Sequence, residues 1–345
     1  MIYFNCDYNE GAHPQVLRQL EKTNLEQTVG YGNDPYCEEA RQRICQLCAQ
    51  PDADVQLLVG GTQANSIVIA SILRPHQGVL CADTGHINVH ETGAVEATGH
   101  KVLPLPGKNG KITAEQVRTA VLAHWKDPAF EHTVQPGMVY ISFPTEVGTL
   151  YSRQELGDLY AVCRELDIPL FIDGARLGYG LVSPECDLTL AELAALCDVF
   201  TIGGTKVGAL FGEAVVLVDP RLQKGFRYLV KQRGGLLAKG RLLGVQFSAI
   251  LEEELYFTLS RQADEFAMKI RRAFEAKGCP MLYDSYTNQQ YPILPDKLLH
   301  ELEREFAFAF WCKTDETHTA VRICTSWATT QRAVDTLLRR LKQFA

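Results

Sequence analysis

The chain has 345 residues, 46% of them hydrophobic and 22% charged, which is typical of a globular protein large enough to bury an extended core. Its 34 lysine and arginine residues against 41 aspartate and glutamate residues give a formal charge of −7 at pH 7, and this excess of acid argues against a dedicated nucleic-acid binder. No apolar run approaches the roughly 18 residues of a membrane span, and Asp7 comes before any apolar core of signal-peptide length. We therefore expect neither a membrane nor a nucleic-acid partner.

The first part of the chain predicts an irregular arm followed by a helix. Residues 1–40 are expected to form the arm, because turn-forming glycine, asparagine and proline gather at 30–35. The segment Cys37–Ala49 is typical of a helix, and it carries Cys45 and Cys48 in a C-x-x-C spacing. No second cysteine pair lies nearby, so ordinary helix packing is favoured over a zinc or redox role. The 11 cysteines, an odd number spread through apolar segments, favour a reducing cytoplasm over a disulfide framework.

Residues 41–235 alternate between short β-branched runs and segments with helical periodicity. Strands are expected at Val55–Val59, Gly78–Cys81, Lys101–Leu105, Met138–Phe143, Leu170–Ile172, Val199–Ile202 and Ala214–Val218. Helices are expected at Thr62–Leu73, Val89–Thr98, Thr113–Trp125, Ser152–Glu165 and Thr189–Ala195. This repeated alternation predicts a large α/β domain whose central sheet is mostly parallel and is covered by helices on both faces.

Residues 236–345 have a different pattern, which predicts a smaller α+β C-terminal domain. Its long helices are expected at Leu242–Ser260 and Arg261–Lys277, with a break near the polar Thr258–Ser260 stretch. Its remaining elements are short strands at Pro280–Tyr283, Ala307–Trp311 and Ala320–Cys324, and a closing helix at Thr330–Gln343.

Functional residues are expected directly after the predicted strands, because ligands of such sheets bind beyond the carboxyl ends of parallel strands. Gly60–Asn65 follows the first of these strands and opens a helix. This arrangement binds anions through free backbone N–H groups, although ordinary tight turns share it. Asp173 and Lys206 each follow a later strand, so their side chains should meet in the same crevice. The Gly203–Lys206 run does not have the spacing of a P-loop.

Together these residues predict a site for pyridoxal 5′-phosphate. An anion nest at Gly61–Thr62 suits the phosphate, the Lys206 amine suits the aldehyde, and a carboxylate such as Asp173 keeps the ring nitrogen protonated. His86 is a candidate to stack on the ring. With His90 four residues later it could instead bind a metal, but a third convincing ligand is missing, so no metal site is expected.

With these motifs in place, the chain resembles the threonine aldolase and aromatic amino acid β-eliminating lyase family of fold type I pyridoxal phosphate enzymes. The matching segments occur in the order of the family and span nearly the whole chain. They are Asp7–Pro14, Gly30–Pro35, Gly61–Asn65, His86 with Glu91 and Gly93, Asp173–Arg176, Gly204–Lys206 and Arg322–Trp327. The resemblance implies the fold type I architecture, in which a mostly parallel central sheet with helices on both faces is joined to a smaller C-terminal domain.

The resemblance also implies which residues hold the cofactor. Lys206 would form the covalent link to the aldehyde, Asp173 would hold the ring nitrogen, and Arg176 would hydrogen-bond the 3′-oxygen. His86 would stack on the ring and is a candidate base. Gly61–Thr62 would hold the phosphate.

The same resemblance assigns the substrate contacts. Arg322 would grip the α-carboxylate of an amino acid, a task that suits a guanidinium fork. Cys6 stands where relatives often have a polar residue near that carboxylate. Family members are dimers or dimers of dimers with active sites at the interface. We therefore expect a homodimer or homotetramer, in which Tyr31 and the basic Lys231–Arg241 loop are candidates to reach the site of a neighbour.

One position departs from the family pattern. Many threonine aldolases have a histidine that helps bind the substrate hydroxyl after the strand that here is Met138–Phe143, and this chain has Glu146 at that point. A glutamate could accept a proton from a β-hydroxyl, but its ordinary pKa of about 4.3 makes it a different base. The alternative is that Glu146 is a structural turn residue.

The expected activity is the cleavage of the Cα–Cβ bond of an L-β-hydroxy amino acid, such as L-threonine or L-allo-threonine, to glycine and an aldehyde. Two alternatives stay open. One is a β-eliminating lyase that acts on an aromatic or other L-amino acid. The other is a nucleotide-binding α/β protein that uses Gly60–Thr62 or Gly203–Lys206. A non-catalytic binding module is disfavoured, because neither Lys206 nor Asp173 is needed to hold a core.

Overall fold

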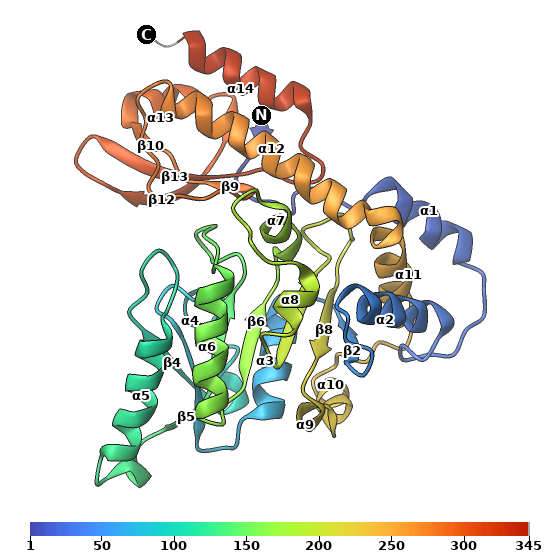
Figure 1. The fold of residues 1–345 in the computed structure, drawn as a ribbon. Coiled ribbons are helices and arrows are strands. Elements are labelled where there is room, and N and C mark those ends of the chain that lie inside the picture. The colour runs from blue at the N-terminus through green and yellow to red at the C-terminus, as the bar shows by residue number, and fades with distance from the viewer. Residues whose placement is uncertain (344–345) are drawn as a thin grey trace.

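The computed structural model describes residues 1–343, and its largest feature is a seven-stranded sheet (Figure 1). In chain order its strands are β2 (Asp54–Leu58), β3 (Gln77–Ala82), β4 (Lys101–Leu105), β5 (Gln135–Ser142), β6 (Leu170–Asp173), β7 (Val199–Gly203) and β8 (Glu213–Leu217). Their order across the sheet is β2-β8-β7-β6-β5-β3-β4, and within it β8 alone runs against the direction of the others. The expected mostly parallel central sheet is therefore confirmed.

Helices cover both faces of this sheet, and alternating strand residues face two separate apolar cores. In β5, Ile141 joins the larger core, and Tyr140 joins the smaller core together with α3 (Gly61–Ile72). Ser152 caps the helix α6 (Arg153–Glu165) in a capping box with Glu155. The other helical elements of this part are α2 (Pro35–Leu47), α5 (Ala114–Lys126), η2 (Phe130–His132), α6 (Arg153–Glu165), α7 (Leu177–Val182), α8 (Leu190–Ala194), α9 (Pro220–Gln223) and α10 (Phe226–Gln232).

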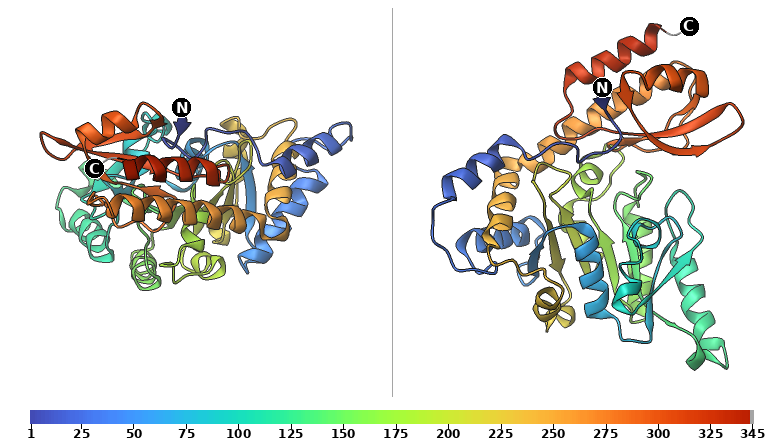
Figure 2. Two further views of the ribbon diagram at one scale, coloured as in Figure 1. Left: turned by 90° about the horizontal axis from the view of Figure 1, so that it is seen from above. Right: turned by 180° about the vertical axis from the view of Figure 1, so that it is seen from behind.

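A second, smaller layer contains the last strands and also the beginning of the chain (Figure 1 and Figure 2). β1 (Ile2–Tyr3) pairs in parallel with β11 (Phe306–Ala307), so the N-terminus is built into this part of the molecule. The other strands here are β9 (Gln289–Gln290), β10 (Ile293–Pro295), β12 (Ala309–Lys313) and β13 (His318–Cys324), and β13 pairs with each of the other three. Their helices, which share a third apolar core, are α12 (Leu255–Glu275), α13 (Asp296–Leu302) and α14 (Gln331–Gln343).

Two expectations for the first hundred residues are wrong. The helix expected at Val89–Thr98 is replaced by α4 (His86–Val89) and the 3-10 turn η1 (Glu96–Thr98), because Thr92 and Gly93 between them adopt positive φ angles of 53° and 72°. The arm is not irregular throughout, since it contains α1 (Pro14–Thr23), which begins with a proline at the first helical position.

Two expectations for the C-terminal part are also wrong. The long helices break at Glu253 and Glu254, which have positive φ angles within the 3-10 turn η3 (Glu252–Glu254), and not at Thr258–Ser260, which lies inside α12. The helix before the break is α11 (Arg241–Ile250). No strand forms at Pro280–Tyr283, where only an isolated bridge joins Met281 to Pro292.

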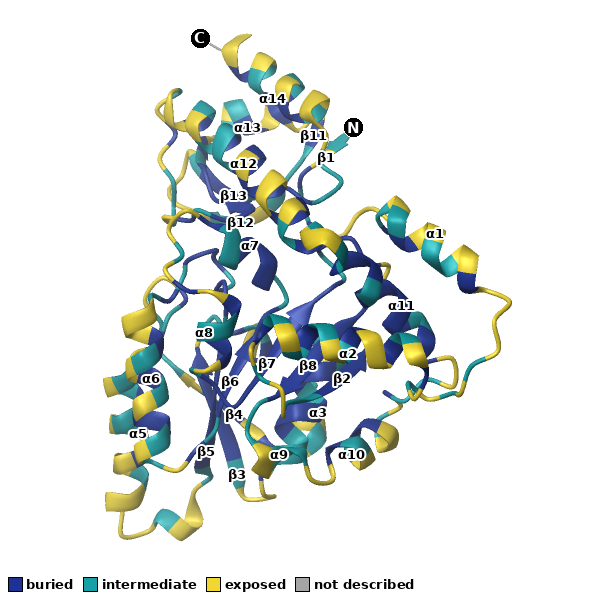
Figure 3. Ribbon diagram, turned by 45° about the vertical axis from the view of Figure 1, so that its right-hand side comes forward, coloured by how far each residue is buried: buried dark blue, intermediate teal, exposed yellow. Residues whose placement is uncertain are grey.

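Buried residues fill the central sheet and the inner faces of its helices, while α5 and α14 present exposed outer faces (Figure 3). No helix within residues 1–343 is both long and apolar enough to cross a membrane. The division into an arm at 1–40, a large domain at 41–235 and a small domain at 236–345 stays a prediction.

Candidate active site

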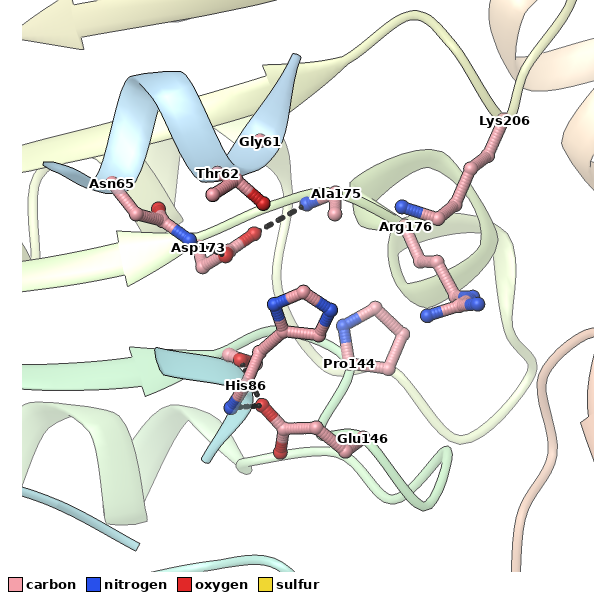
Figure 4. Close-up of a pocket in the computed structure, with 11 residues that line it drawn as sticks. Gly61, Thr62, Asn65, His86, Pro144, Glu146, Asp173, Ala175, Arg176 and Lys206 are labelled. Atoms are coloured by element: carbon pink, nitrogen blue, oxygen red, sulfur yellow. Dashed lines mark hydrogen bonds between the residues drawn. The ribbon is translucent and has the colours of Figure 1, made fainter. Parts of the chain in front are cut away.

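The carboxyl ends of β5 and β6, the segment after β7 and the N-terminus of α3 surround a pocket of about 570 Å³, counted with the space open to solvent (Figure 4). Eleven residues line it: Gly61, Thr62, Asn65, His86, Ser142, Pro144, Glu146, Asp173, Ala175, Arg176 and Lys206. All six residues expected to hold the cofactor are among them, and so is Glu146. Asp173 and Lys206 therefore share one cavity, as a single cofactor site requires.

Asp173 is the last residue of β6 and is buried, with its carboxylate held by three donors. Oδ2 accepts hydrogen bonds from Asn65 Nδ2 at 2.9 Å and from the Tyr140 hydroxyl at 2.7 Å, and Oδ1 accepts one from the Ala175 N–H at 2.9 Å. Burial alone would raise the pKa of Asp173, but the charge of His86 and these hydrogen bonds bring it below its ordinary value. The group is therefore an anion at neutral pH.

His86 begins the short helix α4 and is tied to Asp173 through other polar side chains. Its Nδ1 lies 2.7 Å from Glu91 Oε1, and the same oxygen accepts a hydrogen bond from Asn65 Nδ2 at 2.8 Å. Burial lowers the pKa of His86, but the hydrogen bond with Glu91 and the charge of Asp173 raise it above its ordinary value. These bonds hold the ring in one orientation and leave Nε2 for a ligand.

Sequence reasoning gave no role to three members of this network, Asn65, Glu91 and Tyr140. Asn65 lies in a segment that matches the family, yet its link between Asp173 and Glu91 depends on contacts 108 and 26 residues away in the chain. Tyr140 lies in the apolar strand β5. A buried tyrosine usually needs a hydrogen-bond partner, so its hydroxyl was the one feature of the sequence that could have indicated a polar contact there.

Lys206 extends its side chain into the pocket from the segment that follows β7 (Figure 4). This segment is held on both sides of the lysine. The Tyr179 hydroxyl donates to the Lys206 carbonyl at 2.6 Å, and Thr205 Oγ1 donates to Glu213 Oε1 at 3.1 Å. Glu213 is buried, and burial raises its pKa to about 8 although the nearby Lys206 charge opposes the shift.

The N-terminus of α3 forms an end of the pocket that suits a phosphate. The first backbone N–H groups of a helix have no partner within the helix, and no side chain caps α3 at Gly60. A Cβ atom added at Gly60 or Gly61 would meet nothing within 4 Å, so the backbone is open to a ligand. An anion bound here would also meet the positive end of the helix dipole.

Arg176 is engaged by the N-terminal arm. Its Nε and Nη2 donate to the two carboxylate oxygens of Asp7 at 2.7 and 2.9 Å, and Asn288 Nδ2 also donates to Asp7 at 2.9 Å. Burial would raise the pKa of Asp7, but the Arg176 guanidinium outweighs it and lowers the pKa to about 2. Two donor groups of Arg176 are thus taken by the protein, and Nη1 is left for the expected contact with a 3′-oxygen, which stays a prediction.

Glu146 lies after β5 on the wall of the pocket. Its Oε1 accepts hydrogen bonds from the His86 N–H at 2.9 Å and from Ser142 Oγ at 2.6 Å, while its backbone carbonyl accepts one from the Tyr291 hydroxyl at 2.8 Å. Burial raises the pKa of Glu146, although the hydrogen bond from Ser142 opposes the shift. Glu146 is therefore a buried, hydrogen-bonded side chain on the pocket wall, and its role as a base stays a prediction.

Three residues expected to bind substrate lie outside this pocket. Arg322 on β13 lines an adjoining pocket, and its Nη2 donates to the Asn5 carbonyl at 3.2 Å. Cys6 donates its thiol to Asn9 Oδ1 at 3.0 Å. Tyr31 is 46% exposed, and its ring centre lies 4.4 Å from the Lys231 amine. The expectation that Tyr31 serves a neighbouring subunit stays a prediction. Among residues 1–343, no three metal-binding side chains gather into a cluster.

Comparison with known proteins gives the family of the chain. Residues 10–296 match the model of a family described as β-eliminating lyase. A low specificity L-threonine aldolase of Pseudomonas sp. (strain NCIMB 10558) is 32% identical over 268 residues, which cover 76% of this chain and 75% of that protein. A low specificity L-threonine aldolase of Pseudomonas aeruginosa is 28% identical over 98% of this chain and 96% of its own length. The solved structure of Leishmania major threonine aldolase has a TM-score of 0.96 and 41% identity, covering 99% of each chain.

The fold and the pocket thus define a fold type I lyase that depends on pyridoxal 5′-phosphate, as the sequence predicted. The chain belongs to the β-eliminating lyase family. Its donor set fits the cofactor, because one cavity offers a lysine amine, a carboxylate that stays ionised and an open helix N-terminus.

Proposed function

We propose that this lyase cleaves the Cα–Cβ bond of an L-β-hydroxy amino acid such as L-threonine and releases glycine and an aldehyde. The observation that carries the proposal is the single pocket lined by Lys206, Asp173 and Glu146. The similarity to threonine aldolases of Pseudomonas and Leishmania supports a substrate of the threonine type.

Each residue of the pocket would contact a different part of the cofactor. When bound, pyridoxal 5′-phosphate supplies an aldehyde that captures amines and a ring that accepts electrons. Lys206 would hold the aldehyde through its amine, and the Gly61–Thr62 backbone would bind the phosphate. Asp173 would keep the ring nitrogen protonated, because its own carboxylate remains ionised. His86 would lie against the ring, fixed by Glu91.

Arg322 would bind the α-carboxylate of the substrate. Its Nε is buried and has no hydrogen-bond partner among the described residues, which is costly unless a ligand supplies an acceptor. A guanidinium and a carboxylate form paired hydrogen bonds with defined geometry. Arg322 would therefore orient the amino acid so that the bond to be broken is aligned with the cofactor ring.

Glu146 would take the proton from the β-hydroxyl group. Its Oε1 is occupied by His86 and Ser142, so Oε2 is the atom that would accept the proton. Because burial raises the pKa of Glu146, the carboxylate is a stronger proton acceptor than an exposed glutamate. Loss of this proton allows the β-carbon to leave as an aldehyde.

We also propose a cytoplasmic homodimer or homotetramer with active sites at the interface between subunits. Exposed apolar side chains near the arm, Leu25, Val29, Tyr31 and Tyr228, are of the kind that an interface covers. All eleven cysteines, which lie within the described residues, are free thiols, and this suits a reducing compartment.

The test begins with the absorbance spectrum of the purified protein and continues with a product assay. We expect a visible band that shifts when glycine or L-threonine is added, and glycine and acetaldehyde in equal amounts from L-threonine. Lys206→Ala should lose both the band and the turnover. Ammonia and 2-oxobutanoate in place of glycine would assign the chain to β-elimination and overturn the proposal.

A further inference from the structure

A second pocket adjoins the cofactor pocket and shares Glu146 with it. Its lining residues are Asp83, Thr84, Val89, His90, Glu146, Ala309, Phe310, Trp311 and Arg322. It encloses about 1030 Å³, counted with the space open to solvent, against about 570 Å³ for the cofactor pocket. Neither the cofactor nor the carboxylate of an amino acid accounts for its apolar residues.

The apolar wall of this pocket comes from β12 in the smaller layer. In a regular strand, neighbouring residues point to opposite faces. The ladder between β12 and β13 shifts register between Phe310 and Cys312, so Trp311 has no partner in it. Such a bulge re-aims side chains, and here the consecutive residues Phe310 and Trp311 both line the pocket.

The two aromatic residues differ in how firmly they are held. The Trp311 ring lies edge-on to Tyr291, with ring centres 4.9 Å apart, and its Nε1 is 3.4 Å from the Tyr283 hydroxyl. Phe310 is 68% exposed. Trp311 is thus a fixed surface, while Phe310 leaves much of its ring for a ligand to cover.

The apolar wall is joined to Glu146. Tyr291, which packs against Trp311, donates its hydroxyl to the Glu146 carbonyl at 2.8 Å. A ligand group that contacts Trp311 therefore lies next to Tyr291, the residue that holds the backbone of Glu146. Tyr291 thus connects the apolar wall to the backbone of the proposed proton acceptor.

The polar residues around the pocket are largely engaged or uncharged. Asp83 Oδ1 accepts a hydrogen bond from the Gly107 N–H at 3.0 Å. Burial and the charge of His86 lower the pKa of His90, so its ring is neutral at physiological pH. Arg322 is assigned above to the substrate carboxylate. What is left uncovered is mainly apolar surface from Val89, Phe310 and Trp311.

We infer that this pocket receives the group attached to Cβ of the substrate and selects for an aryl or another large apolar group. The inference rests on the proposed function, because Arg322 then holds the carboxylate and Glu146 the β-hydroxyl. With both ends fixed, the remaining substituent of Cβ enters the pocket that Arg322 and Glu146 line together with Phe310 and Trp311.

Phe310→Ala tests the inference through kinetics, because the side chain is exposed and its loss should leave the fold unchanged. We expect the wild type to have a higher kcat/KM for L-phenylserine than for L-threonine. The variant should lose about fivefold for L-phenylserine, mainly through KM, and keep its value for L-threonine. Trp125→Ala, which removes a half-exposed aromatic side chain from α5, far from the proposed interface residues, should change neither value. An equal loss for both substrates, or no loss for either, would overturn the inference.

A binding measurement separates this inference from the proposed reaction. L-phenylalanine and L-alanine lack the β-hydroxyl and cannot be cleaved in this way, so calorimetry on the holoenzyme reports recognition of the side chain alone. We expect tighter binding of L-phenylalanine and a smaller difference in Phe310→Ala. If no β-hydroxy amino acid is cleaved but this difference is observed, the proposed function fails while the pocket assignment stands. Equal binding of both amino acids to the wild type would contradict the pocket assignment.

Discussion

Among single residues, the charge of Asp173 has the most direct chemical consequence. Asp173→Asn keeps the size of the side chain and removes its negative charge, so the ring nitrogen of the cofactor would lose the partner that keeps it protonated. We expect kcat to fall about a hundredfold or more, while far-UV circular dichroism stays unchanged. Near-normal turnover with bound cofactor would contradict the role given to Asp173.

Glu146 is predicted to act on the substrate and not on the cofactor. Glu146→Gln keeps acceptor capacity at the side-chain oxygen but cannot take a proton, so kcat for cleavage of L-threonine should fall about a hundredfold. Cofactor affinity, followed by the visible absorbance during dialysis, should change little. Glu115→Gln, at an exposed position on α5, serves as the control. Equal losses of cofactor and of activity in Glu146→Gln would contradict this placement.

Glu213 should make stability depend on pH. Its pKa is about 8 in the folded chain against an ordinary value of 4.5, so between these values the folded chain holds a proton that the unfolded chain releases. Stability from this group therefore falls as pH rises from about 4.5 to about 8. The charge of Lys206 opposes the shift and that of Asp173 reinforces it.

Glu213→Gln stays neutral at every pH and should flatten this profile. In thermal unfolding, the variant and the wild type should have similar melting temperatures near pH 5, and the variant should be higher by several degrees near pH 9. Parallel profiles for the two proteins would show that Glu213 does not carry a raised pKa.

At the scale of helices and strands, the sequence predicts those features that are set by residues close together in the chain. The strand and helix alternation places Asp173 and Lys206 correctly, because Asp173 ends β6 and Lys206 lies in the segment just after β7. Hydrophobic periodicity does not predict helix boundaries that depend on the backbone conformation. At Thr92 and at Glu253, positive φ angles interrupt helices that the periodicity would continue. Tyr140 was missed for another reason, since its partner Asp173 lies on the adjacent strand.

The N-terminus of α3 allows a prediction of cofactor affinity. Gly61→Ala adds a methyl group that meets nothing within 4 Å in the protein, so the fold should tolerate it and even gain helix propensity. A phosphate that approaches this backbone closely would meet the methyl group. We expect weaker cofactor binding with an unchanged or higher melting temperature of the apoprotein. Gly157→Ala, in a similarly open position on α6, should leave cofactor affinity unchanged.

For the whole molecule, the arm, the central sheet and the smaller layer meet at one buried carboxylate. Asp7 pairs with Arg176, 169 residues away, and with Asn288, 281 residues away. No local pattern in the sequence predicts such contacts, although both Asp7 and Arg176 stand in segments that match the family. The same long-range packing brings β1 beside β11 and places the start of the chain against the site.

Asp7→Asn should loosen this junction. The pKa of Asp7 is about 2 in the folded chain against an ordinary 3.8, so its contribution to stability is complete above pH 3.8 and is lost as pH falls towards 2. Breaking the pair leaves the buried Arg176 charge without its partner, and we expect a loss of about 3 kcal/mol in urea unfolding at pH 7. The difference from the wild type should shrink below pH 4. Asp315→Asn, which alters a carboxylate bonded only to Thr317 and His318 in its own turn, should have a much smaller effect. Equal stability of Asp7→Asn and the wild type at pH 7 would mean that packing alone, and not this ion pair, holds the arm against the rest of the molecule.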